Sequence, residues 1–298
     1  MRGILNRVFS ILSRQESNHI ESSSSEHSYV DDSNLDNIDN ARCGRLSFES
    51  FTHKGRVRSQ NEDSCVAIGG TSFGEQRNRQ GALFILADGM GGYEGGSRAS
   101  MRASDIVSDR LAPSVLAPFL FGSQAPSDSI TDLMTQAVHD ANNTVREEMQ
   151  GSGTTVSTVL LLGDWMYLAH VGDSRVYIHV DGKKNLELLS EDHSLVQRLI
   201  STGQIDADEA VLHPQRNVLY QAIGQDSRLS VQTLAKKVPE RGWILLCSDG
   251  LWGHVKDDDI AFVLNDSNSV IDAGNRLVNL ALDAGGTDNI SVILAHLT

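Results

Sequence analysis

The hydrophobic positions divide the chain into a polar N-terminal stretch and a long region of short strands and helices. Alternating or continuous hydrophobic runs predict β-strands, whereas hydrophobic residues three and four apart predict helices. Because runs of hairpin strands are interrupted by helices, the order favours antiparallel sheets with helices outside over a regular βαβ arrangement. We expect strands at 46–51, 65–68, 82–87, 155–162, 165–171, 175–180, 186–189, 229–235, 243–247 and 290–296, helices at 97–111, 129–149 and 270–283, and short helices and loops over 191–217.

The first 45 residues have a different pattern. Residues 1–14 (MRGILNRVFSILSR) place hydrophobic residues at helical spacing with arginines between them. Such a short basic amphipathic helix can lie on an anionic membrane or contact a partner; the alternative is a frayed terminus without function, since short helices are marginal alone. Residues 16–40 contain no Lys or Arg and are rich in Ser, Asn and Asp, which predicts a disordered linker. We therefore expect one folded domain over 46–298.

Composition narrows the class of protein. Hydrophobic residues make up 40% of the chain, which is enough for a buried core. The formal net charge of -14 argues against nucleic acid as a partner and leaves carboxylates available as cation ligands. The three cysteines include no CxxC pair, which is typical of reduced thiols in a cytosolic protein. No hydrophobic run reaches the roughly 18 residues that span a bilayer, so a cytoplasmic location is expected, with membrane contact limited to residues 1–14.

Five acidic residues stand at the ends of predicted strands: Asp63, Asp88, Asp173, Asp249 and Asp288. If these side chains meet at one rim, they repel one another and raise each other's pKa unless cations neutralise them. Ligands that are nearly all oxygen favour Mg²⁺ or Mn²⁺ over zinc. A single Asp-Gly is usually only a β-turn. Five acids in matching positions favour a site for hard divalent cations.

Other catalytic chemistries lack their motifs in this sequence. There is no HExxH or paired CxxC zinc motif and no Gly-x4-Gly-Lys phosphate loop. The glycines near Gly91 do not complete a dinucleotide fingerprint, because position 94 is Glu. The segment around Ser174 lacks the Gly-x-Ser-x-Gly pattern of a serine hydrolase.

Eight short motifs occur in a fixed order along the predicted domain. Together they resemble the type 2C metal-dependent protein phosphatase (PPM) family in its compact bacterial form, over about 250 residues. No single motif is decisive, whereas the ordered set is specific. The motifs are 52–63 (THKGRVRSQNED), 87–92 (ADGMGG), 152–155 (SGTT), 169–175 (AHVGDSR), 191–194 (EDHS), 213–217 (HPQRN), 248–252 (SDGLW) and 286–290 (GTDNI).

The resemblance implies an α+β fold, a four-layer α-β-β-α sandwich with two central antiparallel sheets. It also implies two core Mn²⁺ or Mg²⁺ ions and a third, weaker one at one end of the sheets. Asp88 would bridge the two core ions, and the carbonyl of Gly89 would bind one of them. Asp249 and Asp288 would hold the first ion. The remaining members of the implied ligand set are Glu62 and Asp63, which would act through metal-bound waters, and Asp173, which with Asp249 would bind the third ion.

The same resemblance assigns Arg58 to the substrate phosphate, for which a guanidinium fork is well suited. Water attack between two cations needs no protein nucleophile. Some relatives carry a histidine after the Asp-Gly that could act as general acid; here that residue is Met90, which cannot donate a proton. His170 and His193 lie in nearby motifs, but a structural role is expected for each.

The implied activity is hydrolysis of phosphoserine and phosphothreonine on proteins, with phosphorylated proteins as substrates and a Ser/Thr kinase as opposing partner. The segment 191–217 would be the variable flap beside the site. One alternative is a pseudophosphatase that binds phosphoproteins without hydrolysis, which the intact Asp88, Asp249 and Asp288 argue against. The other is a metal-dependent phosphodiesterase or nuclease, which the acidic net charge argues against.

Overall fold

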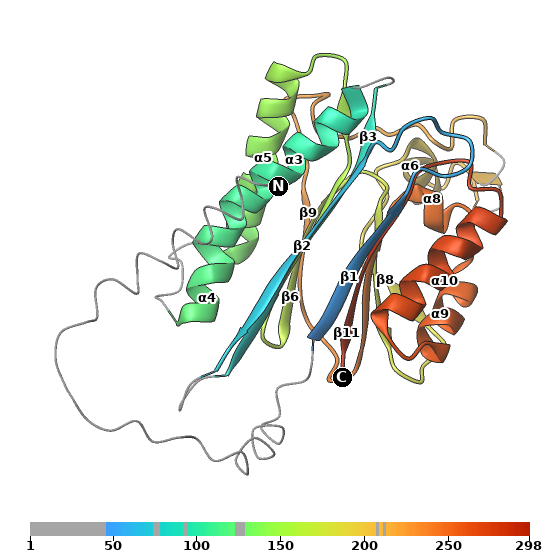
Figure 1. The fold of residues 1–298 in the computed structure, drawn as a ribbon. Helices are drawn as coiled ribbons and strands as arrows, with labels where there is room; N and C mark the ends of the chain where they lie inside the picture. The colour runs from blue at the N-terminus through green and yellow to red at the C-terminus, as the bar shows by residue number, and fades with distance from the viewer. Residues whose placement is uncertain (1–45, 74–77, 92–94, 123–128, 207–208, 211–212) are drawn as a thin grey trace, which may run out of the picture. The chain divides into compact units, whose positions relative to one another are not determined.

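The computed structural model describes residues 46–73, 78–91, 95–122, 129–206, 209–210 and 213–298. Two antiparallel sheets form its centre (Figure 1). The first, the β1 sheet, has the order β1 (Leu46–His53), β11 (Ile290–Leu297), β10 (Gly242–Cys247), β7 (Arg175–Val180) and β8 (Leu186–Leu188). The second, the β3 sheet, has the order β2 (Asp63–Ser72), β3 (Arg79–Met90), β5 (Val156–Leu162), β6 (Trp165–Val171) and β9 (Gln232–Lys237), with β4 (Gly153–Thr154) paired to the end of β3.

Helices cover the outer face of each sheet (Figure 1). On the β3 sheet these are α3 (Gly95–Leu111) and α5 (Ile130–Glu148), with a π-helical turn (Ala112–Leu116) and α4 (Ala117–Phe121) between them in the chain. On the β1 sheet they are α8 (Asp249–Trp252), α9 (Asp257–Asp266) and α10 (Val270–Asp283). The helix α6 (Leu195–Ser201) lies in the segment that follows β8.

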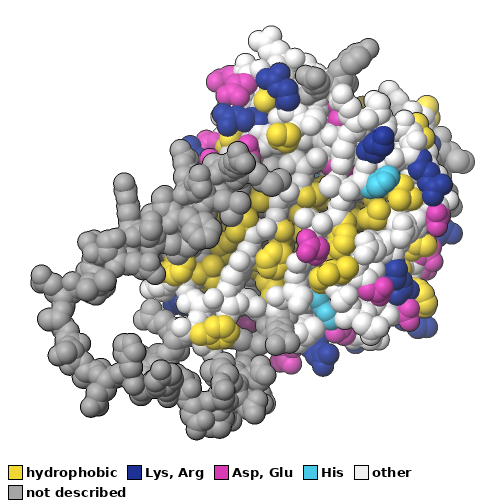
Figure 2. Space-filling model, in the orientation of Figure 1, with side chains coloured by type: hydrophobic (Ala, Val, Ile, Leu, Met, Phe, Trp, Pro, Cys, Tyr) yellow, Lys and Arg dark blue, Asp and Glu magenta, His cyan; other side chains and the backbone are white. Residues whose placement is uncertain are grey.

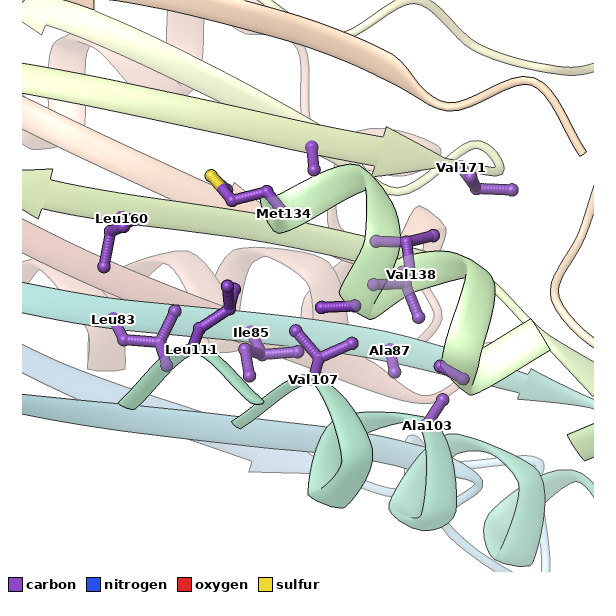
Figure 3. Packing of buried hydrophobic residues seen from close by; sticks show 14 of the residues in the cluster. Leu83, Ile85, Ala87, Ala103, Val107, Leu111, Met134, Val138, Leu160 and Val171 are labelled. Atoms are coloured by element: carbon purple, nitrogen blue, oxygen red, sulfur yellow. The ribbon is translucent and has the colours of Figure 1, made fainter. Parts of the chain in front are cut away.

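Three hydrophobic cores separate the four layers. In the first, α3 and α5 pack on the β3 sheet through side chains such as Val107, Val138 and Ile85 (Figure 3). The second lies between the sheets and includes Phe84 and Leu246, and the third lies between the β1 sheet and its helices. The predicted α-β-β-α sandwich is therefore confirmed. The edge strands β1 and β2 contact each other, and Figure 2 shows a band of hydrophobic side chains over them.

Several predicted elements agree with the structure to the residue, including the strands 165–171 and 175–180 and the helix 270–283. The strand expected at 229–235 was misplaced, because β9 spans Gln232–Lys237 and Leu229 instead packs into the core from a loop. The strand expected to end at Ala87 continues to Met90, since its last two residues pair with β4. The helix α9 was not predicted, nor were the π-helical turn and helix α4 at 112–121. The latter segment contains Pro113 and Pro118, and proline usually argues against a helix.

The expectations for residues 1–14, 16–40 and Cys43 lie outside the described residues. Within the described ranges, no helix combines the length and the hydrophobicity needed to cross a membrane. Cys65 and Cys247 are free thiols, as expected. Burial raises the pKa of both, which keeps them protonated and unreactive at neutral pH.

Candidate active site

Four of the predicted acidic residues come from strand ends at one rim of the two sheets. Asp63, the first residue of β2, lies directly opposite Asp88 of β3 in the antiparallel register. Asp249 begins α8 just after β10, and Asp288 lies just before β11. Because Cys247 pairs with Val292, the end of β10 and the start of β11 lie together. Each sheet therefore brings two carboxylates to the rim.

Hydroxyl groups join the two sheets at this rim. The hydroxyl of Ser248, the residue before Asp249, donates to Asp63 Oδ2 at 3.0 Å. The backbone N–H of Ser291 donates to Ser248 Oγ at 2.9 Å, and Ser291 Oγ lies 2.8 Å from Thr52 Oγ1. Ser248 and Ser291 are buried and Thr52 is exposed. Because the donor to Asp63 is a neutral hydroxyl, the charge of the Asp63 carboxylate is not neutralised by this bond.

The backbone of Asp88 is held on both sides. Its N–H donates to Thr155 Oγ1 at 2.9 Å, and its carbonyl accepts from the Thr155 N–H at 2.8 Å and the Thr154 hydroxyl at 2.9 Å. The next N–H, that of Gly89, donates to the Glu62 carbonyl at 3.1 Å. A Cβ at Gly89 would overlap the Gly96 carbonyl, so the approach of α3 to this turn requires glycine.

The carboxylates at the rim are electrostatically unfavourable to one another. Burial, with repulsion from neighbouring carboxylates, raises the pKa of Asp88 and of Asp249 well above the ordinary range. Burial likewise raises the pKa of Asp63 to about 6 and that of Asp173 to about 7. For Asp88 the repelling groups are Asp63, Asp249, Asp173 and Asp288, so all five predicted acids contribute to one field.

Two oxygen atoms at the rim are buried and have no hydrogen-bond partner among the described residues: Glu62 Oε1 and Asp63 Oδ1. Unpartnered buried carboxylate oxygens are costly unless a cation or a proton satisfies them. The donor set is entirely oxygen, which suits Mg²⁺ or Mn²⁺. Among the residues that the structure describes, however, no three acidic, histidine or cysteine side chains form a ready-made metal-ligand cluster. The residues fit such an ion by chemistry and burial, and their role as ligands is a proposal.

Arg58 contacts this cluster from the loop between β1 and β2. Its Nη2 lies 2.6 Å from Asp288 Oδ2, and half of its side chain is exposed. The hydrogen bond to Asp288 raises the pKa of the guanidinium, and Asp249 and Glu62 add to the attraction. Arg58 is thus placed where the carboxylates of the rim meet solvent.

Sequence reasoning gave no role to Asn289, which the structure places at the centre of the site. Its side-chain oxygen accepts from the Glu62 N–H at 2.8 Å, and its amide donates to the carbonyls of Lys54 and Gln60 at 2.9 and 2.8 Å. The loop that carries Arg58 is therefore fixed to the residue after Asp288. The only signal in the sequence was that Asn289 belongs to the motif 286–290.

Asp173 lies in the turn between β6 and β7, and two histidines pack behind that turn. His170 is fully buried; its Nε2 lies 3.0 Å from the Gly172 carbonyl and its Nδ1 2.8 Å from Ser157 Oγ. Burial lowers the pKa of His170 to about 3 and also lowers that of His193. Nδ1 of His193 accepts from the Gly172 N–H at 3.2 Å. Both rings have the structural role expected from the sequence.

Comparisons with known proteins identify the family of this chain. A family model described as protein phosphatase 2C matches residues 59–279. The serine/threonine phosphatase stp of Listeria welshimeri is 30% identical over 254 residues, which cover 83% of this chain and 94% of that protein. The chain belongs to the protein phosphatase 2C family, as the motifs indicated.

Solved structures give the same result. The serine/threonine phosphatase of S. agalactiae matches with a TM-score of 0.71 and 32% identity, covering 85% of this chain and 100% of that one. The catalytic domain of the serine/threonine protein phosphatase PstP, in complex with two manganese ions, matches with a TM-score of 0.68 and 29% identity, covering 85% of this chain and 98% of that one.

Proposed function

We propose that this chain hydrolyses phosphoserine and phosphothreonine on proteins with the help of Mn²⁺ or Mg²⁺. The observation that carries this proposal is the group of half-buried carboxylates from both sheets, which raise one another's pKa and, among the described residues, include a buried oxygen without a hydrogen-bond partner. Membership of the protein phosphatase 2C family and the likeness to a two-manganese phosphatase support the same activity.

Divalent ions would be held by Asp88, the carbonyl of Gly89, Asp249 and Asp288. Glu62 and Asp63 would accept from waters around the ions, and Asp173 would share a third, weaker site with Asp249. When bound, such ions supply positive charge that lowers the pKa of water and stabilises anionic oxygens. The Ser248 hydroxyl bonds to Asp63 and the Thr155 hydroxyl bonds to the backbone of Asp88, so the chain would contribute oriented carboxylates rather than a nucleophile.

Arg58 would bind the substrate phosphate. Its guanidinium is half exposed at the mouth of the rim and presents several donors in one plane, which suits two phosphate oxygens. In the structure it pairs with Asp288, so phosphate binding and Asp288 compete for the same donors. Asn289 bonds to the carbonyls of Lys54 and Gln60, on either side of Arg58, and would hold the loop in place while the Arg58 side chain exchanges partners.

Two finer assignments accompany this function. The chain would oppose a Ser/Thr kinase, since a protein phosphatase needs phosphorylated proteins as substrates. Residues 1–14 would provide peripheral contact with an anionic membrane or a partner; their basic amphipathic pattern supports this.

The test is phosphate release from a phosphothreonine peptide by the purified full chain over a range of Mn²⁺ concentrations. We expect hydrolysis that depends on Mn²⁺, a loss of at least about 100-fold in Asp249→Asn and a similar loss in Arg58→Ala. The matched control is Arg276→Ala, which removes an arginine paired with Asp266 and Asp272 on the outer helices. Peptide binding without phosphate release at any Mn²⁺ concentration would identify a pseudophosphatase, and cleavage of a phosphodiester would identify the nuclease class.

A further inference from the structure

The backbone of the loop between β1 and β2 is fixed against the segment 286–288, which precedes β11. The Arg56 N–H donates to the Gly286 carbonyl at 2.7 Å. Gly55 is buried with a φ of +79°, and a Cβ there would overlap the carbonyls of Gly286 and Asp288. The two bonds of Asn289 described above hold the loop on both sides of this contact. The loop therefore runs alongside 286–288 in a defined register.

The side chains of this loop, by contrast, extend into solvent and include a cluster of positive charge. Every residue of 52–60 except Gly55 is exposed. These residues include Lys54, Arg56 and Arg58 and no Asp or Glu, although the chain as a whole has a formal net charge of -14. A local concentration of positive charge attracts anionic groups. The loop is therefore a basic surface directly beside the acidic rim.

Arg56 has a partner that a ligand can replace. Its Nη2 lies 3.1 Å from Asp283 Oδ1 at the end of α10, and the two side chains are 59% and 76% exposed. An ion pair this exposed contributes little, because water and salt screen it. The neighbouring Val57 is 68% exposed, so the loop also presents a hydrophobic side chain. Neither side chain has a role in the proposed reaction.

Arg56 and Arg58 lie beside different residues of the same segment. Arg56 contacts Gly286 through its backbone, and Arg58 contacts Asp288 through its guanidinium. Two residues of an extended chain span at most about 7 Å, in the loop and in a bound peptide alike. A phosphopeptide whose phosphate is bound by Arg58 therefore brings a side chain one or two positions away within reach of Arg56.

We propose that Arg56 is a specificity-determining residue that binds a substrate carboxylate one or two positions from the phosphorylated residue. The guanidinium fork suits the two oxygens of a carboxylate, and Val57 would contact the hydrophobic part of the same peptide segment. The substrate class is therefore phosphoproteins with Asp or Glu next to the phosphorylated residue or one position further. This inference rests on the proposed function, since it names a feature of the substrates of that same site.

The experiment measures kcat and KM of the full chain, in Mn²⁺, for a series of phosphothreonine peptides. The parent peptide has Gln on both sides of the phosphothreonine, and each other peptide has a single Glu one or two positions before or after it. We expect at least one Glu peptide to exceed the parent in kcat/KM by about five- to tenfold, mainly through KM, because the contact is remote from the reacting bond. This preference should decrease at about 0.5 M NaCl, since salt screens an exposed ion pair.

Substitutions assign the preference to one side chain. Arg56→Ala should abolish it and leave kcat/KM for the parent peptide within about twofold of the wild type, because the loop is fixed through its backbone. Arg56→Gln serves the same test if the alanine variant does not fold. Asp283→Asn removes the competing partner and should keep or increase the preference. The controls are Lys54→Ala, which removes another charge from the same loop, and Arg276→Ala on the outer helices.

Each outcome bears on the proposal. It is supported if the preference for Glu disappears in the Arg56 variants alone, while their unfolding midpoints match those of the controls. It is overturned if the wild type hydrolyses every peptide like the parent, if the preference survives in Arg56→Ala, or if Lys54→Ala loses as much of it. Hydrolysis of the parent peptide without any preference leaves the proposed function intact, whereas a wild type that hydrolyses no peptide at any Mn²⁺ concentration refutes both.

Discussion

Asp63 and Asp88 lie directly opposite each other where β2 and β3 reach the rim of the site. Both side chains are largely removed from water, and burial raises the pKa of each. Two facing carboxylates in such surroundings cannot both be ionised at neutral pH without a compensating charge. This pair therefore makes the folded state sensitive to protons and to cations.

The first prediction concerns pH in the absence of divalent ions. The pKa of Asp63 is raised to about 6 and that of Asp173 to about 7, whereas both are near 3.9 in the unfolded chain. The folded state thus binds more protons between about pH 4 and pH 7, so the free energy of unfolding should decrease as pH rises through this window. For Asp63 alone the decrease is about 3 kcal/mol.

Urea unfolding in EDTA at several pH values measures this slope. Asp63→Asn should flatten it, because the amide does not titrate. Two results together would contradict the view that these carboxylates are unneutralised. One is a wild-type free energy of unfolding that is constant or increases from pH 4.5 to pH 7.5, and the other is the same pH dependence in Asp63→Asn.

A second prediction concerns Asp88→Asn. The amide has nearly the same shape and carries no charge, so the metal-free variant at pH 8 should be more stable than the wild type by roughly 1–3 kcal/mol. Phosphatase activity should decrease by about 10³-fold, because the central proposed ligand loses its charge. The exposed Asp164→Asn is the control and should change stability by less than about 0.5 kcal/mol. If metal-free Asp88→Asn is instead less stable than the wild type, the Asp88 carboxylate already has favourable partners within the protein.

Asn289 gives a third prediction. Asn289→Ala removes three hydrogen bonds of a residue that is 5% exposed, so we expect a loss of about 2–3 kcal/mol in the free energy of unfolding. Activity should decrease further than stability alone explains, because the loop of Arg58 loses its anchor. The exposed Asn265 also bridges two backbone groups, and Asn265→Ala should cost less than about 1 kcal/mol. Equal effects of the two substitutions, measured by urea unfolding and peptide hydrolysis, would rule out a special role for Asn289.

The fourth prediction separates helix propensity from packing. Alanine in place of a mid-helix glycine usually stabilises a protein by about 1 kcal/mol. A Cβ at Gly274 of α10, however, would overlap the ring of Phe51 on β1, so Gly274→Ala should destabilise the domain by roughly 1–3 kcal/mol. Asn279→Ala, on the exposed face of the same helix, should be neutral or slightly stabilising. Thermal unfolding of the two variants provides the comparison, and a stabilised Gly274→Ala would contradict the packing at this position.

The elements that were predicted well are those in which the hydrophobic positions of the sequence match the buried positions of the structure. The strands 165–171 and 175–180 and the helix 270–283 have clear periods and contain no proline. The errors occur where tertiary contacts decide. Leu229 packs against the first core from a loop and not from a strand, and β3 extends to Met90 because its last two residues pair with β4.

In the site, too, the positions of residues could be predicted from local sequence, whereas their tertiary contacts could not. Strand-end positions were enough to place Asp63, Asp88, Asp249 and Asp288 on one rim. The contacts that orient them depend on residues distant in the sequence: Ser248 bonds to Asp63, and Asn289 bonds to Lys54. A hydroxyl or an amide in a short motif carries no local sign of its partner. The pairing of Arg58 with Asp288 could not be predicted for the same reason.

The two sheets each supply half of the acidic rim, and hydroxyls already bridge them there. A cation shared by Asp88 and Asp249 would therefore act as a clasp between the two halves of the sandwich. A ligand that binds only the folded state stabilises it by an amount that grows with the logarithm of the ligand concentration. The stability of the contact between the two sheets would therefore increase with the concentration of divalent ions. Amides of β2 and β11 near the rim would then exchange with solvent more slowly as that supply increases, whereas those at the opposite end of the sheets would respond least.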